Sequence, residues 1–168
     1  MQRRTFLRVG LGSALVLGSL GAGLWWWRPG WADGQFTPGA RRVLVRLCEA
    51  VLACTLPEED AARARVLEGL IARLQGFAAG LPAATRAELG QLLGLMALPP
   101  GRRWLVGLAQ DWDRASLAQV QAGLEQMRQS AWVLRRQTYH ALRDMINATY
   151  FSDPAQWPLL GYPGPADL

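Results

Sequence analysis

Hydrophobic residues recur at intervals of three and four along most of the chain, the spacing of one face of an α-helix. Thr37 followed by Pro38 predicts the first helix start, because Thr caps helix N-termini and Pro suits the first helical position. Pro57 ends that pattern, and the acidic run 58–60 predicts a second helix that closes at Gly80. The expected buried positions are Val43, Leu44, Leu47, Val51 and Leu52, then Val66, Leu67, Leu70, Ile71, Leu74 and Phe77.

The second half of the chain continues the helical pattern with interruptions. The segments 85–88 (Thr-Arg-Ala-Glu) and 116–119 (Ser-Leu-Ala-Gln) have the form of capping boxes and predict two more helix starts. Pro-Pro-Gly at 99–101 predicts a break followed by a short helix. The stretch 117–149 is expected to be helical, with a bend near Ser130. These helices carry Leu89, Leu92, Leu93 and Met96, then Trp104, Leu105 and Leu108, and in the last one the inward positions Trp132, Tyr139, Leu142, Met145 and Ile146.

Sustained alternation with a period of two does not occur, and β-branched residues are sparse. The sequence therefore predicts an all-α domain over residues 33–168, an irregular bundle of five or six helices. The tail 150–168 is expected to be extended and non-helical, because it is rich in proline. Its Trp, Tyr, Phe and Leu side chains are too apolar for a free tail. We expect it to pack on its own bundle, with the tip 161–165 reaching a partner.

A different pattern precedes the bundle. The run 9–27 is uncharged and contains five glycines, and its 19 residues would span about 28 Å as a helix. The eight residues before it, Met-Gln-Arg-Arg-Thr-Phe-Leu-Arg, resemble a twin-arginine translocation signal. The residues that carry this resemblance are Arg3, Arg4, Phe6 and Leu7.

Residues 1–32 are consistent with a cleaved signal peptide or with an uncleaved signal anchor. Small residues at Gly30 and Ala32 suit cleavage before Asp33. The tryptophans 25–27 and 31 gather at the outer end of the apolar run, where an anchor would place an aromatic belt. Both alternatives predict a periplasmic location reached by the twin-arginine route, with or without attachment to the inner membrane.

The charge distribution argues against a nucleic-acid partner. All 18 basic residues are arginine, and the formal net charge is +5. Four of these arginines precede Asp33, so 14 arginines face 13 acidic residues from there onward, a balance of +1. A nearly neutral body has no broad basic face for nucleic acid.

The residues that usually carry catalysis are scarce. His140 is the only histidine, which excludes a histidine cluster for a metal, and we expect it to have a structural or surface role. Cys48 and Cys54, six positions apart on a helix, would point about 120° apart and could not form a disulfide; we interpret both as small core residues. Nucleophile-elbow, dinucleotide-binding and P-loop motifs do not occur. We expect a non-catalytic chain with no cofactor or metal of its own.

The C-terminal residues carry a second resemblance: Arg135, Tyr139 and Leu142, then Tyr150-Phe151-Ser152-Asp153-Pro154, Trp157 and Gly161-Tyr162-Pro163-Gly164. This pattern is similar to the end of gluconate 2-dehydrogenase subunit 3-like proteins, small twin-arginine-bearing subunits of periplasmic flavoprotein dehydrogenases. It covers the signal and about the last 35 residues, and it lacks the family's Gly-Gly-Asn segment between the Asp-Pro and the Trp. The chain looks closer to the companion of an alcohol-oxidising enzyme than to the subunit of a sugar-acid enzyme.

The resemblance implies a small subunit without catalytic residues whose partner is an FAD-dependent dehydrogenase of the glucose–methanol–choline (GMC) type. Such a chain would carry its signal-less partner through the twin-arginine translocase or anchor it at the inner membrane, with a cytochrome c as a further candidate partner. The twin-arginine route carries folded cargo, and a small cofactor-free domain has little reason of its own to be folded before export. The candidate partner-binding residues are Tyr150, Phe151, Asp153, Trp157, Gly161, Tyr162, Pro163 and Gly164.

Two alternatives from other classes remain. One is a membrane-tethered periplasmic scaffold that holds an enzyme exported by other means. The other is a stand-alone periplasmic binder of small molecules, with tryptophans lining its pocket.

Overall fold

The computed structural model describes residues 29–162, and within that range the protein is mostly helical. The longer helices are α2 (Pro38–Val51), α3 (Asp60–Gly80), α4 (Ala83–Ala97), α6 (Leu117–Arg128) and α7 (Val133–Phe151). The shorter elements are the hairpin β1 (Trp31–Ala32) and β2 (Gln35–Phe36), the turn α5 (Pro99–Gly101) that continues as a π-helical turn Arg102–Val106, and the 3₁₀ helix Pro154–Leu160. The prediction of an all-α fold is confirmed for this part of the chain. The twin-arginine segment, the apolar run and residues 163–168 lie outside the described residues.

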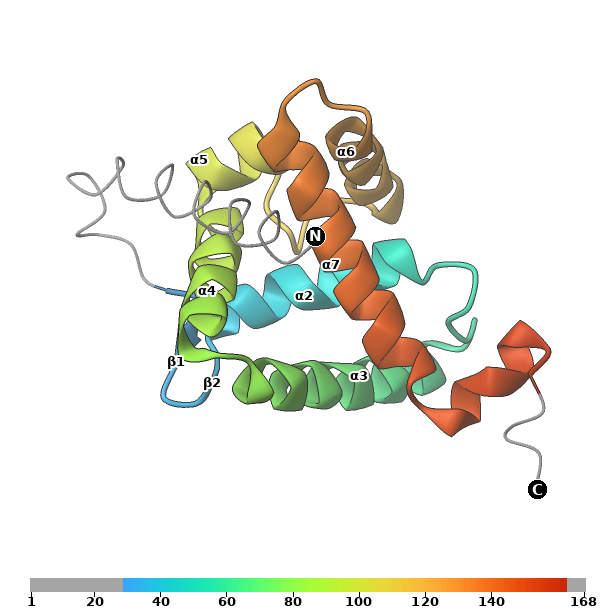
Figure 1. The fold of residues 1–168 in the computed structure, drawn as a ribbon. Helices are drawn as coiled ribbons and strands as arrows, with labels where there is room; N and C mark the ends of the chain where they lie inside the picture. The colour runs from blue at the N-terminus through green and yellow to red at the C-terminus, as the bar shows by residue number, and fades with distance from the viewer. Residues whose placement is uncertain (1–28, 163–168) are drawn as a thin grey trace, which may run out of the picture.

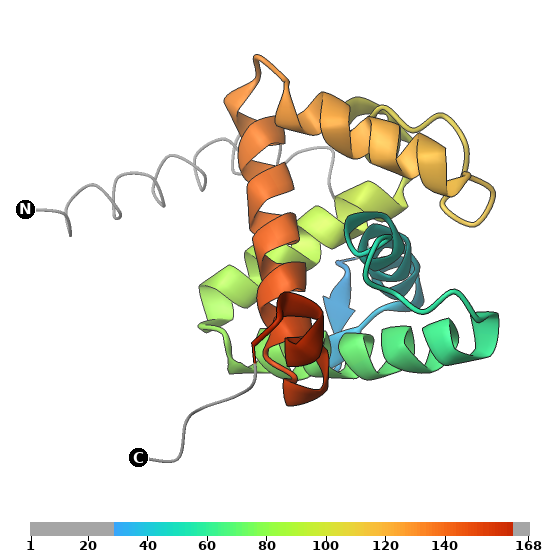
Figure 2. The same cartoon turned by 90° about the vertical axis from the view of Figure 1, so that its right-hand side faces the viewer.

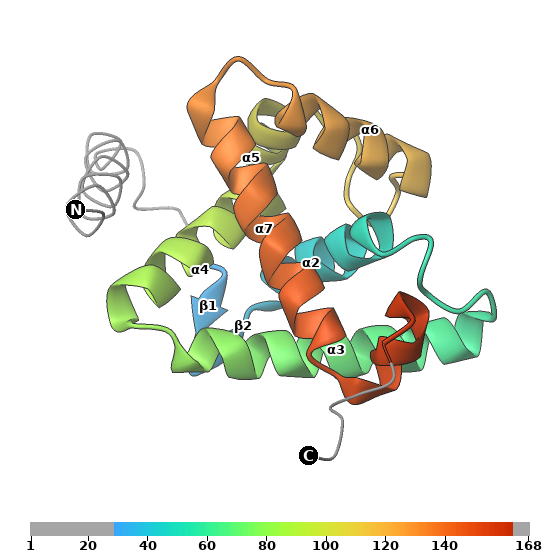
Figure 3. The same ribbon diagram turned by 45° about the vertical axis from the view of Figure 1, so that its right-hand side comes forward.

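The helices pack around α2, which contacts α3, α4, α6 and α7 (Figure 1). One face of α2 is fully buried, with Val43, Leu44, Leu47 and Cys48 in the core. Helix α7 crosses the molecule obliquely, from beside α5 and α6 down to α3 (Figure 3). The helices are therefore not parallel to one another, and the bundle is irregular. Among the helices of residues 29–162, none is long and apolar enough to cross a bilayer.

Two of the predicted helix starts are confirmed by their capping contacts. Thr37 Oγ1 accepts a hydrogen bond from the Ala40 amide at 3.5 Å, and Pro38 is the first residue of α2. Ser116 and Gln119 form a capping box, with reciprocal hydrogen bonds of 3.2 and 2.9 Å, at the start of α6. Helix α3 also closes at Gly80 as expected.

Three predictions of helix extent differ from the structure. The first helix was expected to end at Pro57, but α2 ends at Val51. Helix α4 begins at Ala83 after Pro82, so Thr85 lies inside its first turn and caps nothing; Pro82 supplies the extended entry that the capping box was expected to provide. The helical stretch expected over 117–149 with a bend near Ser130 is two helices, α6 and α7, and the chain is interrupted at residues 129–132, where the bend was expected. The Arg136 guanidinium donates to the Ser130 and Ala131 carbonyls at 2.7 and 3.1 Å and so bonds the first turn of α7 to the connection between the two helices.

The C-terminal segment is not the extended, non-helical tail that its prolines predict. Helix α7 continues through Phe151, and Pro154–Leu160 forms a 3₁₀ helix. Asp153 caps this helix by accepting a hydrogen bond from the Ala155 amide at 3.0 Å. The first proline of the segment, Pro154, takes the first helical position, where the missing N–H costs nothing.

Most expected core positions are buried or half-buried, and besides Cys54 three of them are exposed. Phe77, Trp104 and Trp132 are 47%, 46% and 57% exposed. Phe77 is in α3, Trp104 is in the π-helical turn and Trp132 directly precedes α7. Helical periodicity in the sequence alone could not distinguish them from core residues.

A small β-hairpin precedes the bundle, although the sequence pattern predicted no strand. β1 pairs with β2 in antiparallel register, and the two-residue turn Asp33-Gly34 has positive φ at both positions, 52° and 78°. This is the conformation that Asp-Gly favours in tight hairpins. The hairpin lies against α3 and α4 (Figure 2), so the folded body includes residues on the N-terminal side of the predicted boundary at 33.

Candidate partner-binding surface

Three of the C-terminal candidate residues hold the end of α7 onto the fold. Tyr150 is a core residue whose hydroxyl donates to the Thr55 carbonyl at 3.2 Å. Phe151 is half-buried with its ring edge-on to Tyr150 at 5.0 Å. The Asp153 carboxylate pairs with Arg73 of α3 at 3.1 Å. These contacts show that the chain packs the beginning of its tail on its own bundle.

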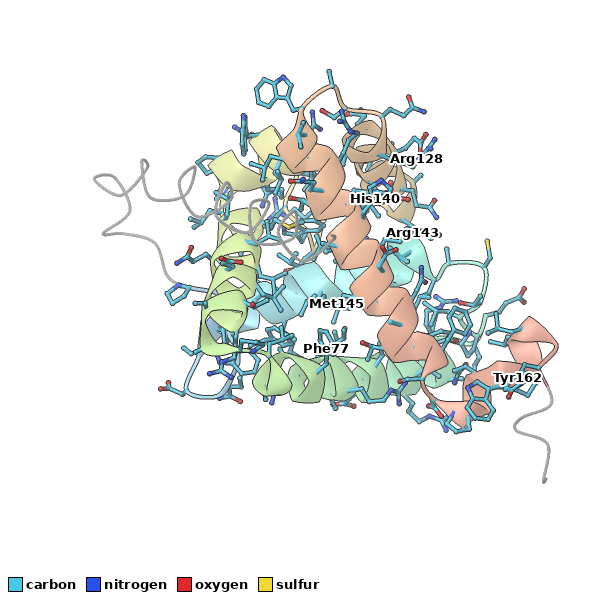
Figure 4. The ribbon with its side chains drawn as sticks, viewed as in Figure 1. Phe77, Arg128, His140, Arg143, Met145 and Tyr162 are labelled. Atoms are coloured by element: carbon cyan, nitrogen blue, oxygen red, sulfur yellow. The ribbon has the colours of Figure 1, made fainter. Side chains whose placement is uncertain are left out.

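The outer part of the tail presents the remaining candidates. Trp157 Nε1 donates to the Phe151 carbonyl at 3.0 Å, and its ring meets the Tyr162 ring edge-on with centroids 5.3 Å apart. Gly161 has a left-handed φ of 68°, which turns the chain at this point. Tyr162 lies at the outer end of this segment, away from the centre of the bundle (Figure 4). Pro163 and Gly164 lie outside the described residues.

A larger apolar surface lies elsewhere, in a cleft between α3, α4 and α7 of about 400 Å³. Phe77 of α3 and Met145 of α7 border it (Figure 4), and Glu88 is the only charged residue in its lining. Its other apolar lining residues are Leu81, Leu89, Leu92, Leu95, Leu105, Leu134, Ala141 and Leu142. We call this feature the α3–α4–α7 cleft. Sequence reasoning missed it, because each of its walls has the periodicity of an ordinary buried helix face.

Two exposed tryptophans lie close in the chain to residues of the cleft lining. Trp104 and Trp132 lie with their ring centroids 5.7 Å apart and are both largely exposed. Trp104 directly precedes Leu105, which lines the cleft. Trp132 precedes Val133 and Leu134, which are both exposed, and Leu134 also lines the cleft. The cleft and the Trp104–Trp132 pair are apolar surfaces that the described residues leave uncovered.

The opposite side of α7 is polar. A groove between α2, α6 and α7 is lined by Glu125, Tyr139 and Arg143 among others. A hydrogen bond from the Arg128 side chain lowers the pKa of Glu125, and the same bond raises the pKa of Arg128. Arg128, Arg143 and His140 lie along this side of the molecule (Figure 4).

His140 is exposed, as expected, and stacks edge-on against the Tyr139 ring at 5.1 Å. Within residues 29–162, no three His, Cys, Asp or Glu side chains gather in a way that could hold a metal ion.

The two cysteines occupy different environments. Both are free thiols, so the expectation of no disulfide is confirmed. Burial raises the pKa of Cys48 to about 12 and keeps its thiol protonated. Cys54 is exposed, and its interpretation as a core residue is wrong, because α2 ends at Val51 and leaves Cys54 in the following loop.

The described residues therefore define an all-α protein, a small irregular bundle with one open apolar cleft. The chain matches no family model, no curated protein and no solved structure.

Proposed function

We propose that this protein is a non-catalytic small subunit of a periplasmic flavoprotein dehydrogenase. It binds an FAD-dependent GMC-type catalytic subunit that has no signal, carries it through the twin-arginine pathway and remains as its subunit or anchor. The structural observation that supports partner binding is the α3–α4–α7 cleft with the Trp104–Trp132 pair. The identity of the partner rests on the N-terminal and C-terminal sequence resemblances.

An uncovered apolar surface of this kind is typical of an interaction site. Soluble proteins rarely leave contiguous apolar patches exposed unless a partner or ligand covers them. Tryptophan is among the residues that most often dominate the binding energy of protein interfaces. Trp132 and Trp104, beside a cleft lined by leucines, have the arrangement of such an anchor region.

The carrier role is tested by changing the twin-arginine pair. In the native host, the double change Arg3→Lys and Arg4→Lys removes the pair and keeps the charge. We expect flavin-dependent dye reduction to disappear from the periplasm and to accumulate in the cytoplasm. Flavoprotein activity that still reaches the periplasm at the wild-type level contradicts the carrier role.

The interface is tested by comparing the cleft with the tail. Leu134→Ala alters the cleft lining and Trp132→Ala alters the tryptophan pair beside it, whereas Tyr162→Ala alters the exposed end of the tail. We expect the first two to reduce the flavin absorbance that co-purifies with the full chain at least tenfold and Tyr162→Ala to have a smaller effect. The reverse order assigns the interface to the tail. Thermal unfolding of each variant is the control for folding. Substitutions at exposed side chains should leave the unfolding temperature unchanged.

The volume of the cleft supports a second candidate function, a stand-alone binder of small molecules. About 400 Å³ falls within the range of ligand pockets, and the lining is mainly apolar with a few polar groups. Trp104 and Trp132 would report occupancy, so quenching of tryptophan fluorescence by apolar alcohols, without any partner, tests this function. Trp132→Phe is the control, because it removes one reporter and leaves the cleft lining intact.

A further inference from the structure

The hairpin fixes the point at which the chain enters the bundle. The Gly30 amide donates to the Gly90 carbonyl of α4 at 2.7 Å, and the Thr37 amide donates to the Gly30 carbonyl at 2.9 Å. The Trp31 ring packs edge-on against Phe36 with centroids 5.0 Å apart, and Phe36 belongs to the core. Gly30 itself is buried. The chain is therefore part of the folded body from Gly30 onward.

The contact between the hairpin and α4 depends on glycine. A Cβ atom on Gly30 would lie 2.8 Å from both the Gly90 oxygen and the Gly94 nitrogen. A Cβ atom on Gly90 would lie 2.9 Å from the Cβ of Trp31. Real Cβ atoms do not approach other atoms so closely, so glycine lets β1 lie directly on α4.

The bond between Ala32 and Asp33, which small residues mark as the expected cleavage site, lies inside this hairpin. Ala32 pairs with Gln35, and Asp33 and Gly34 form the tight turn. A protease needs its substrate segment locally opened. Opening the chain around this bond would break the β1–β2 pairing and draw Gly30 and Trp31 away from α4. The folded hairpin therefore protects the bond from cleavage.

We infer that the exported protein retains residues 1–32 and stays attached to the membrane through its uncharged run, with the bond after Ala32 intact. The inference rests on the proposed function, because the twin-arginine route moves proteins that are already folded. The hairpin is then formed before the bond meets a signal peptidase on the far side of the membrane.

If the uncharged run 9–27 stays attached to the membrane, the orientation of the bundle relative to the membrane is fixed. Three residue steps separate Trp27 from Gly30, a distance of at most about 11 Å. The hairpin side of the bundle would then lie against the membrane surface. Gly90 contacts the hairpin and Leu92 lines the cleft, and residues two positions apart on a helix point about 160° apart. The α3–α4–α7 cleft would thus face away from the membrane, where a flavoprotein could reach it.

The intact mass of the exported chain tests the inference. The full chain is expressed with a C-terminal epitope tag in the native host, and membranes are washed with alkaline carbonate before mass spectrometry. We expect a chain that contains residues 1–32, remains in the washed membranes and exposes its tag to protease added outside spheroplasts. A soluble chain that begins at Asp33 overturns the inference.

A variant that lifts the hairpin without altering the cleavage motif sharpens the test. Gly90→Leu places a side chain under Trp31 and leaves residues 30–33 unchanged. Gly76→Leu in α3 is the matched control, because a Cβ there meets nothing within 4 Å. We expect at least half of the exported Gly90→Leu chain to begin at Asp33 and the Gly76→Leu chain to remain whole. A Gly90→Leu chain that is exported and wholly uncut also overturns the inference, since something other than the hairpin would then protect the bond.

Flavin-dependent dye reduction in the same periplasmic fractions separates this inference from the proposed function. Cleavage after Ala32 together with normal export of the flavoprotein refutes retention alone. A whole, membrane-bound chain with its bundle outside and no exported flavoprotein refutes the carrier role alone. A chain confined to the cytoplasm refutes both.

Discussion

The indole Nε1 of Trp112 donates a hydrogen bond of 2.7 Å to the carbonyl oxygen of Met96, and both residues are buried. Trp112 thereby fastens the loop between the π-helical turn and α6 to the end of α4. Arg46 of α2 holds the same loop from the other side, with its guanidinium donating to the carbonyls of Trp112 and Ala115. A loop without helical structure is thus a fixed part of the core.

Trp112→Phe should destabilise the protein by about 2 kcal/mol, because it leaves the Met96 carbonyl without its buried partner and removes part of a core side chain. Trp104→Phe is the control at an exposed tryptophan and should change the free energy of unfolding by less than about 0.5 kcal/mol. Urea unfolding of the two variants measures the difference. Equal effects would show that the Trp112–Met96 bond contributes nothing specific.

Two aspartates that flank Trp112 should differ in their effect on stability. Asp111 accepts hydrogen bonds from Arg102 at 2.9 Å and from the Trp112 amide at 2.7 Å, and the Arg102 side chain is only 5% exposed. Asp111→Ala should cost about 1–2 kcal/mol, since a buried guanidinium loses its counter-charge while water still reaches the half-exposed site. Asp113→Ala breaks only the exposed pair with Arg42 and should cost less than about 0.5 kcal/mol. Chemical unfolding at low salt measures both, and a larger loss for Asp113→Ala contradicts this account.

Changing the first residue of each capping-box sequence to Ala should have opposite effects on stability. Ser116→Ala removes the side chain that caps α6 and should cost about 1 kcal/mol. Thr85→Ala should leave stability unchanged or raise it by a few tenths of a kcal/mol, because Thr85 lies within the first turn of α4 and Ala has the higher helix propensity. Thermal unfolding of the two variants provides the comparison. A comparable loss for Thr85→Ala would mean that this residue does cap α4.

The sequence predicted the parts of the fold that depend on local chemistry. The Thr37–Pro38 and Ser116–Gln119 starts and the buried face of α2 follow from spacing and capping preferences, and the structure confirms them. The Asp33-Gly34 turn could also be predicted from the sequence, because Asp-Gly favours the positive φ values found there. It was missed because strands of two residues show no alternation.

The cleft could not be predicted from the sequence. Phe77 and Trp132 have the sequence spacing of core residues, but Trp132 directly precedes α7 and both side chains are exposed. Only the packing of α3, α4 and α7 decides that the cleft beside Phe77 stays open. Likewise, Tyr150 gives no local indication that its hydroxyl reaches the Thr55 carbonyl, 95 positions away. Contacts between distant segments set which apolar residues become surface, and those contacts are not encoded in any single window of sequence.

The two thiols should respond differently to alkylation and to pH. Burial raises the pKa of Cys48 from 9.0 to about 12, whereas Cys54 is exposed. Iodoacetamide at pH 8 should therefore modify Cys54 alone in the folded protein and both cysteines in urea, as peptide mapping by mass spectrometry will show. Modification of Cys48 in the folded protein would mean that α2 opens readily.

The same pKa shift makes stability depend on alkaline pH. The folded state holds the Cys48 proton more tightly than the unfolded state, so this contribution is complete below the unfolded pKa of 9.0 and is lost as the pH rises toward about 12. The free-energy advantage of the wild type over Cys48→Ala should therefore shrink between about pH 9 and 12 and stay constant from pH 6 to 8. Cys54→Ala, which removes an exposed thiol, is the control. An advantage that stays the same up to pH 11 would contradict a buried, protonated thiol at Cys48.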